Sequence, residues 1–178
     1  MSEKVLIISA SPRKNGNSDT LCNQFEAGAK ADGKTVEKIF LGDYKINYCQ
    51  GCGHCFNKHE CVQTDDAPSI VKKMIEADVI VLASPVYFYC INGQLKTFID
   101  RCAPYYRQIK NKVFYFLLTA ADNSPDAFDE SMTALSGFIR CLEGATIARV
   151  IKGIGVFRPH EIKENRAFEM AYIAGEEC

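Results

Sequence analysis

The chain has 178 residues, of which 47% are hydrophobic, and its formal net charge is −1. This length allows one α/β domain with a sizeable core, and the charge gives no reason to expect binding to nucleic acid or to an anionic membrane. No apolar run approaches the length of a membrane span, and the first run, Val5 to Ile8, is too short for a signal peptide. We therefore expect a cytoplasmic protein with no nucleic-acid or membrane partner.

Apolar runs and amphipathic segments alternate along the chain. The run at 5–8 is short, β-branched and continuous, as expected of a strand that is covered on both faces. Apolar residues then recur at helical spacing over 21–29, with Gly33 as the expected end of the helix. A second strand is expected at 35–41, followed by a cysteine-rich loop at 43–64.

The second half of the chain continues the same alternation. Asp65 or Asp66 can cap a helix whose inner face lies at 70–75. The further expected elements are a strand at 79–83 followed by a loop at 84–88, a helix at 95–102, a strand at 113–118, a helix at 128–142, a strand at 146–151 and a last helix from about 159 to 174. Five strands that alternate with five helices predict a doubly wound parallel sheet with helices on both faces. Ligands of such sheets bind beyond the carboxyl ends of the strands.

The loop after the first strand is a candidate phosphate site. It contains several hydroxyl side chains, an arginine and a glycine just before a helix, and a helix N-terminus offers unpaired N–H groups and partial positive charge. It matches neither the dinucleotide fingerprint nor the Walker A loop, and it could also be an ordinary loop with Ser18 as a helix cap. The candidate ligands are Ser9, Ser11, Arg13, Asn17 and Ser18.

Two segments resemble those of a known family. The segment 11–18, SPRKNGNS, resembles the G-S-P-R-x-x-G-N-[ST] phosphate loop of the NAD(P)H-dependent FMN reductases, with Ala10 where that family often has glycine. The segments 84–88 (SPVYF) and 93–101 (GQLKTFIDR) are similar to the family's flavin loop and the helix after it. The resemblance extends over about residues 4–175. It implies one flavodoxin-like FMN-binding domain over 1–178, with a five-stranded parallel sheet in the order 2-1-3-4-5 and the cysteine loop inserted after the second strand.

The resemblance also assigns a flavin-ring site. Pro85, Val86, Tyr87 and Phe88 are expected to line the isoalloxazine ring, because aromatics beside a proline at a strand end form a flat apolar wall with backbone donors. The alternative is that Tyr87 and Phe88 belong to the core. By position, Thr119 and Ala120 after the fourth strand are expected to form a third wall of the site. Lys96, Asp100 and Arg101 are expected to form an ion pair or an interface rather than a catalytic set.

Nine cysteines are many for a cytoplasmic chain, and four of them are clustered. The spacing Cys49-x2-Cys52-x2-Cys55-x5-Cys61 is typical of a [4Fe–4S] site, and it resembles the compact motif of the iron–sulfur flavoproteins, which belong to the same family. Zinc, a labile disulfide and free thiols remain alternatives. His54 and His59 are expected to be solvent-exposed rather than ligands. The five scattered cysteines, at 22, 90, 102, 141 and 178, are expected to be small core residues.

The resemblance implies an FMN-dependent oxidoreductase. Hydride would pass from NAD(P)H to bound FMN, and electrons would continue to an unidentified small-molecule or protein acceptor, directly or through a [4Fe–4S] cluster. No catalytic side chain is expected, because the flavin supplies the chemistry. A non-enzymatic electron carrier is the alternative, whereas a phosphorylation receiver would need acidic residues where this chain has Ser9, Ala10 and Ser11. The family also implies a homodimer or tetramer, with the aromatics at 87–89 and 105–106 near the ring face.

Overall fold

The computed structural model describes residues 2–178, which form a mainly parallel sheet. Its parallel strands lie in the order β2-β1-β3-β5-β6. Their bounds are β1 (Lys4–Ser9), β2 (Thr35–Phe40), β3 (Val79–Tyr87), β5 (Val113–Thr119) and β6 (Thr146–Gly153). This confirms the expected flavodoxin-like order. The additional strand β4 (Cys90–Ile91) was not expected, and it pairs antiparallel with the end of β3.

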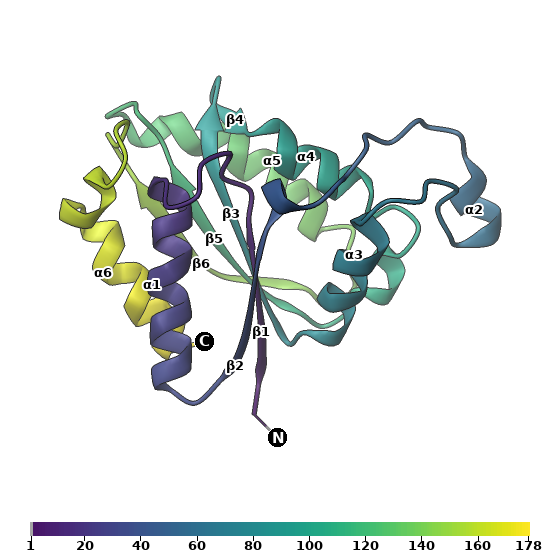
Figure 1. Cartoon of the computed structure of the whole chain (residues 1–178), viewed down its shortest axis with the longest axis horizontal. Helices are drawn as coiled ribbons and strands as arrows, with labels where there is room; N and C mark the ends of the chain where they lie inside the picture. Colours follow the sequence, from purple (N-terminus) through teal and green to yellow (C-terminus); the bar gives the residue numbers. More distant parts are fainter. Residues whose placement is uncertain (1) are drawn as a thin grey trace.

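Helices cover both faces of the sheet (Figure 1). The helices α1 (Asn17–Ala31) and α6 (Arg166–Glu176) pack together on one face. The helices α3 (Ala67–Glu76), α4 (Gly93–Asp100) and α5 (Asp129–Ile139) cover the other face. A short helix, α2 (His54–Lys58), lies inside the cysteine loop. None of the helices between residues 2 and 178 is long and apolar enough to cross a membrane.

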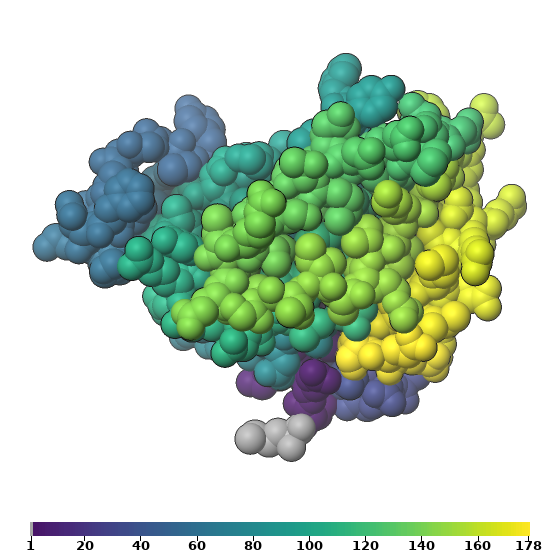
Figure 2. Space-filling model, turned by 180° about the vertical axis from the view of Figure 1, so that it is seen from behind, coloured from purple at the N-terminus to yellow at the C-terminus, as the bar shows by residue number. Residues whose placement is uncertain are grey.

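Two segments stand out from the body of the molecule. The cysteine loop with α2 extends to one side, and the turn between β3 and β4 rises above the carboxyl edge of the sheet (Figure 1). The view from behind shows the same two protrusions, in blue and in teal (Figure 2). Both segments are therefore accessible to a ligand or to another protein chain.

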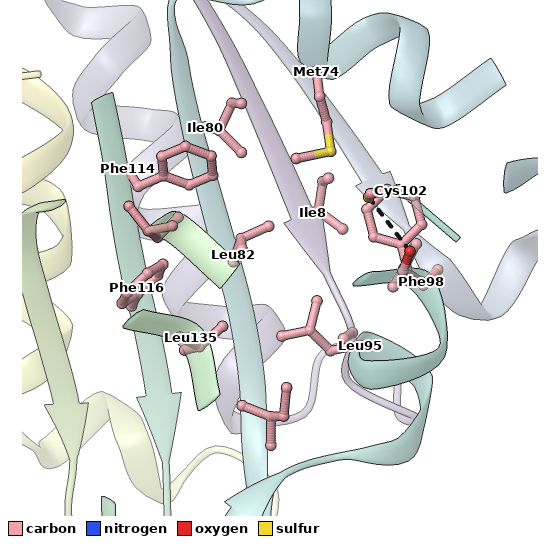
Figure 3. Close-up of a cluster of buried hydrophobic side chains, with 14 of the residues drawn as sticks. Ile8, Met74, Ile80, Leu82, Leu95, Phe98, Cys102, Phe114, Phe116 and Leu135 are labelled. Carbon is pink, nitrogen blue, oxygen red and sulfur yellow. Dashed lines mark hydrogen bonds between the residues drawn. The ribbon is translucent and has the colours of Figure 1, made fainter. Parts of the chain in front are cut away.

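The core is divided by the sheet into two layers, and β1 contributes to both. Leu6 and Ile8 point toward α3, α4 and α5, whereas Val5 and Ile7 point toward α1 and α6. Figure 3 shows the first layer, in which Ile8 lies among side chains from β3, β5 and the helices. The alternation follows from the period-two geometry of a strand. It explains why a continuous apolar run forms a central strand.

Two elements differ most from their expected bounds. β3 continues through Tyr87 instead of ending at residue 83, because its last residues pair with β5 and then with β4. This pairing outweighs the turn signal of Ser84 and Pro85. The last helix begins at Arg166 rather than near 159, because Asn165 caps it by accepting a hydrogen bond from the N–H of Ala167.

Candidate flavin and cysteine site

The loops after β1 and β3 are joined at the carboxyl edge of the sheet. The N–H of Ala10 donates to the carbonyl of Ala83 at 2.9 Å. Asn92, which is fully buried, donates from its side chain to the carbonyl of Ala10, and its backbone N–H donates to Ser84 Oγ at 3.0 Å. Asn92 also caps α4 by accepting from the N–H of Leu95. Asn92 was not among the residues expected at this site, although an asparagine just before a helix is a known cap signal.

The loop after β1 is wound tightly around Gly16. A Cβ at this position would lie 3.0 Å from both the carbonyl oxygen of Arg13 and Ser11 Oγ. Ser11 Oγ donates to that carbonyl at 2.8 Å and accepts from the N–H of Arg13 at 3.2 Å. α1 follows directly, with Gly16 at its N-cap and, within residues 2–178, no side chain bonded there as a cap. The first N–H groups of the helix are therefore left for another acceptor, which suits a phosphate.

The predicted phosphate residues differ in their contacts. Ser18 Oγ lies 2.8 Å from Thr119 Oγ1, so the structure brings together two candidates, one from the first turn of α1 and one from the end of β5. Asn17 instead donates to the carbonyl of Arg158 at 3.0 Å. Ser9 is buried, and its hydroxyl has no hydrogen-bond partner in the described part of the chain. Arg13 is exposed, so its side chain is free to turn toward a ligand.

The flavin-loop residues form a β-hairpin rather than an irregular loop. Val86 pairs with Ile91 and Tyr87 with Cys90, so Phe88 and Tyr89 form the two-residue turn. Both turn residues have positive φ, 49° and 66°, which a hairpin turn of this kind requires but which aromatic residues rarely adopt. Such backbone conformations cost about 1–3 kcal/mol each, and they tend to cluster at functional sites.

The turn holds its two aromatic side chains differently. Tyr89 is fixed against the body, since its hydroxyl donates to Asp122 at 3.3 Å and its carbonyl accepts from Ser131 Oγ at 3.2 Å. Phe88 is completely exposed, and Tyr87 is 44% exposed. The alternative that Tyr87 and Phe88 belong to the core is therefore wrong.

The last two candidates lie on the neighbouring strand. Thr119 pairs with Pro85 of β3 and with Gly153 of β6, which places it beside the hairpin's first strand. Ala120 is buried, and its N–H donates to the carbonyl of Gly153 at 2.9 Å. The ends of β1, β3 and β5 thus form one continuous edge.

The four clustered cysteines line a single cavity of about 110 Å³, which also contacts Arg101 and Pro104. All four are free thiols. Gly51 and Gly53, which lie between them, have φ of +64° and +74°, a conformation that glycine adopts at little cost. The N–H of Gly51 donates to the Cys49 sulfur at 3.5 Å. The loop is therefore wound so that all four cysteines border the same cavity.

The four clustered cysteines do not form a ready site for a single metal ion. Within residues 2–178, no three His, Cys, Asp or Glu side chains are close enough together to hold one metal ion. A single zinc ion needs its thiolates about 2.3 Å from a common centre, whereas a cluster binds each thiolate through a different iron atom and keeps them farther apart. The structure thus brings the four cysteines to one cavity without the geometry of a single-ion site.

A buried ion pair joins the cysteine loop to the end of α4. The side chains of Arg101 and Asp65 are 1% and 0% exposed, and the guanidinium donates to both carboxylate oxygens, at 2.5 and 2.9 Å. Burial alone would raise the pKa of Asp65, but the hydrogen bonds from Arg101 and from the N–H groups of Asn47 and Ala67 lower it below its usual value. Arg101 also donates to the carbonyl of Asn47 at 2.8 Å and to the sulfur of Cys61 at 3.3 Å.

This pair differs in part from what the sequence indicated. Lys96 and Asp100 do form an ion pair, at 2.6 Å, but Arg101 pairs with a residue from another segment. Asp65 does accept a hydrogen bond from the first turn of α3, through Ala67, while its carboxylate mainly binds Arg101. Asp66, at the N-cap position, accepts from the N–H of Lys45 instead.

Comparison with known proteins decides the family. Residues 3–147 match the family described as NADPH-dependent FMN reductase, which is most of the chain. The chain belongs to this family.

Curated relatives of this FMN reductase family member include two archaeal iron–sulfur flavoproteins. One, from Archaeoglobus fulgidus, is 44% identical over 102 residues, which are 57% of this chain and 46% of the relative. The other, from Methanocaldococcus jannaschii, is 42% identical over 112 residues, which are 62% of this chain and 58% of the relative. The chain thus matches about half the length of these relatives.

Solved structures show the same fold as this FMN reductase family member. The NAD(P)H:quinone oxidoreductase from Methanothermobacter marburgensis superimposes with a TM-score of 0.76 at 17% identity, covering 99% of this chain and 96% of that one. An azoreductase from Bacillus anthracis gives a TM-score of 0.74 at 21% identity, with coverage of 99% and 100%. At these identities the likeness shows the fold alone.

Some expectations for this family member's remaining residues are wrong. His59 is exposed as expected, and the side chain of His54 is 37% exposed, with Glu60 3.8 Å away. Of the five scattered cysteines only two, at 22 and 102, are buried; those at 90 and 178 are half-buried and the one at 141 is exposed. Tyr105 and Tyr106 follow α4, whose eight residues extend over about 12 Å, and they line cavities beside α3 and the cysteine loop rather than the hairpin.

Proposed function

We propose that this chain is an FMN-dependent oxidoreductase that takes hydride from NAD(P)H and passes electrons to a small-molecule or protein acceptor. The observation that carries the proposal is the uncapped start of α1 in a loop wound around Gly16, beside an exposed aromatic hairpin at the same sheet edge. The free N–H groups at the start of the helix suit a phosphate, and the aromatic hairpin suits a flat ring, so a ligand that carries both groups fits where the two features adjoin. Membership in the FMN reductase family supports the same assignment.

The side chains have distinct roles in this proposal. The phosphate group is held by the first turn of α1, with Ser9, Ser11, Arg13, Asn17 and Ser18 around it. Thr119, within hydrogen-bond distance of Ser18, and Ala120 form the wall between phosphate and ring. Pro85, Val86, Tyr87 and Phe88 line the ring. The bound flavin supplies the redox chemistry, so the task of these residues is to bind and orient it and no general acid or base is assigned.

The first expected result concerns which flavin binds. Because the loop offers donors for one terminal phosphate, the protein should bind FMN more tightly than riboflavin, which lacks the phosphate, by about tenfold or more. Fluorescence titration of the flavin-free protein with FMN, FAD and riboflavin measures this difference. Equal affinity for FMN and riboflavin would show that the loop after β1 holds no phosphate.

We also propose a [4Fe–4S] cluster on Cys49, Cys52, Cys55 and Cys61. Four free thiols around one cavity, and two relatives that are named iron–sulfur flavoproteins, support it. Such a group transfers single electrons, which would let electrons leave the flavin one at a time. Thiolate ligation needs a reducing compartment, and we therefore assign the protein to the cytoplasm.

A homodimer or tetramer is the proposed assembly. Exposed aromatic residues usually mark an interaction surface, and this chain exposes the hairpin residues Tyr87, Phe88 and Tyr89 as well as Tyr48 and Phe56 of the cysteine loop. These two groups lie on the two protrusions of the molecule (Figure 1). A second copy that covers them would bring a cysteine loop close to a flavin edge.

Light scattering tests this assembly. FMN-loaded protein at micromolar concentration should have at least twice the mass of the 19.8 kDa chain. Phe88→Ser should shift the equilibrium toward monomer, because it removes a fully exposed aromatic side chain from the proposed interface. Ile173→Ser, on the outer side of α6, is the matched control and should leave the mass unchanged. A monomeric wild-type protein would contradict the proposal.

A further inference from the structure

Arg101 contacts both ends of the cysteine loop, although it lies outside that loop in sequence. Its guanidinium donates to the carbonyl of Asn47 before the first cysteine, to the sulfur of Cys61, the last, and to Asp65 just beyond it. Four hydrogen bonds from one side chain therefore close the loop at its base. The loop otherwise extends away from the body of the protein (Figure 1).

The position of Arg101 in the chain links this contact to the proposed flavin site. It follows α4 directly, and the N-cap of α4 is Asn92, the residue that joins the hairpin to the loop after β1. The helix has eight residues and is therefore about 12 Å long. One short, rigid element thus connects the hairpin with the base of the cysteine loop.

The ion pair of Arg101 with Asp65 does not by itself explain this arrangement. Buried ion pairs contribute little net stability, because the cost of removing two charges from water offsets their attraction. Neutralising Asp65 also does not require the hydrogen bond from Arg101 to the sulfur of Cys61. The contact with Cys61 instead places a fixed positive charge 3.3 Å from a proposed ligand atom.

We propose that Arg101 is a positioning residue that holds the cysteine loop closed and makes a metal group bound there easier to reduce. Reduction adds negative charge to such a group, and a nearby buried cation stabilises the more negative state. Asp65 orients the guanidinium through two hydrogen bonds, and Asn47 fixes the other end of the loop. The effect on reduction rests on the proposed cluster, whereas the closing of the loop rests on the contacts alone.

Two substitutions separate these effects. Arg101→Gln removes both the charge and the fork of donors, whereas Arg101→Lys keeps the charge but cannot make all four hydrogen bonds. Because Arg101→Gln leaves Asp65 without its partner, the double variant Arg101→Gln/Asp65→Asn is included to avoid an unpaired buried charge. Arg107→Gln is the matched control, since it makes the same change of charge on an exposed neighbour whose Nε donates to the hydroxyl of Tyr106.

The first measurement is hydrogen exchange of residues 47–64 in the metal-free protein. In all three Arg101 variants these amides should exchange about tenfold faster than in wild type, because the loop loses its closing contacts. Exchange in the central strands should be unchanged. Unchanged exchange in all Arg101 variants would overturn the proposal. This result is obtained whether or not the chain binds a cluster.

The second measurement is the reduction potential after anaerobic reconstitution with iron and sulfide. In Arg101→Gln and in the double variant, the equilibrium between the oxidised and the reduced cluster should shift about tenfold toward the oxidised form. This corresponds to a reduction potential about 59 mV lower than that of wild type for one electron. Arg101→Lys should stay closer to wild type because it keeps the charge. An unchanged potential in Arg101→Gln would overturn the claim that Arg101 makes the metal group easier to reduce. A wild type that takes up no iron would instead refute the proposed cluster, and hydrogen exchange would then decide the role of Arg101.

Discussion

Replacing Cys52 by serine should abolish the broad visible absorbance of the proposed iron–sulfur cluster while leaving FMN bound. Cys52 is one of four thiols around a single cavity, and a [4Fe–4S] group needs a thiolate for each iron. The phosphate loop belongs to a different segment, at the start of α1, so the flavin should not be affected. Absorbance spectra with iron, sulfide and flavin analysis of anaerobically purified protein measure both cofactors.

Cys141→Ser is the control for this variant. Cys141 is exposed after α5 and does not line the cavity, so its replacement should keep both signals. The cluster proposal fails if the wild-type protein contains FMN but no iron or acid-labile sulfide and reconstitution adds none. The flavin assignment would survive that outcome, with the cysteines left as thiols or as a disulfide.

Arg13→Ala should weaken FMN binding about tenfold or more. The exposed guanidinium can fork onto phosphate oxygens, and losing a charge-assisted contact of this kind costs about 1.5–3 kcal/mol. Lys14→Ala is the matched control in the same loop, because Lys14 already pairs with Asp43 at 2.8 Å and should contribute little to binding. Titration of the flavin-free variants gives the two affinities. An unchanged affinity of Arg13→Ala for FMN would show that Arg13 does not contact the phosphate.

The central strands were predictable because their sequences are short, continuous and apolar. Residues 5–8 and 113–118 can only be buried on both faces, and the alternation with amphipathic helices leads to a parallel sheet. β4 was not predictable in the same way, because it has two residues and follows a turn of Phe88 and Tyr89. Turn statistics favour asparagine and glycine at these positions, so local sequence argues against the hairpin that the structure forms.

The site was predictable where spacing along the chain determines proximity. The four cysteines lie within 13 residues of one another, and they do line one cavity. The pair of Arg101 and Asp65 joins residues that are 36 positions apart, and only the packing of α4 beside the loop brings them together. Asp65 had a sufficient local explanation as a helix cap, so nothing in the sequence pointed to a buried cationic partner.

The most direct test of the proposed function is anaerobic titration of the FMN-loaded protein with NADPH and with NADH. We expect one FMN per chain, and we expect at least one of the two nucleotides to bleach its visible absorbance, with reoxidation when an acceptor such as a quinone is added. Bound FMN that neither nucleotide reduces would contradict the enzymatic proposal and favour a non-enzymatic electron carrier. A protein that binds no FMN at all would contradict both.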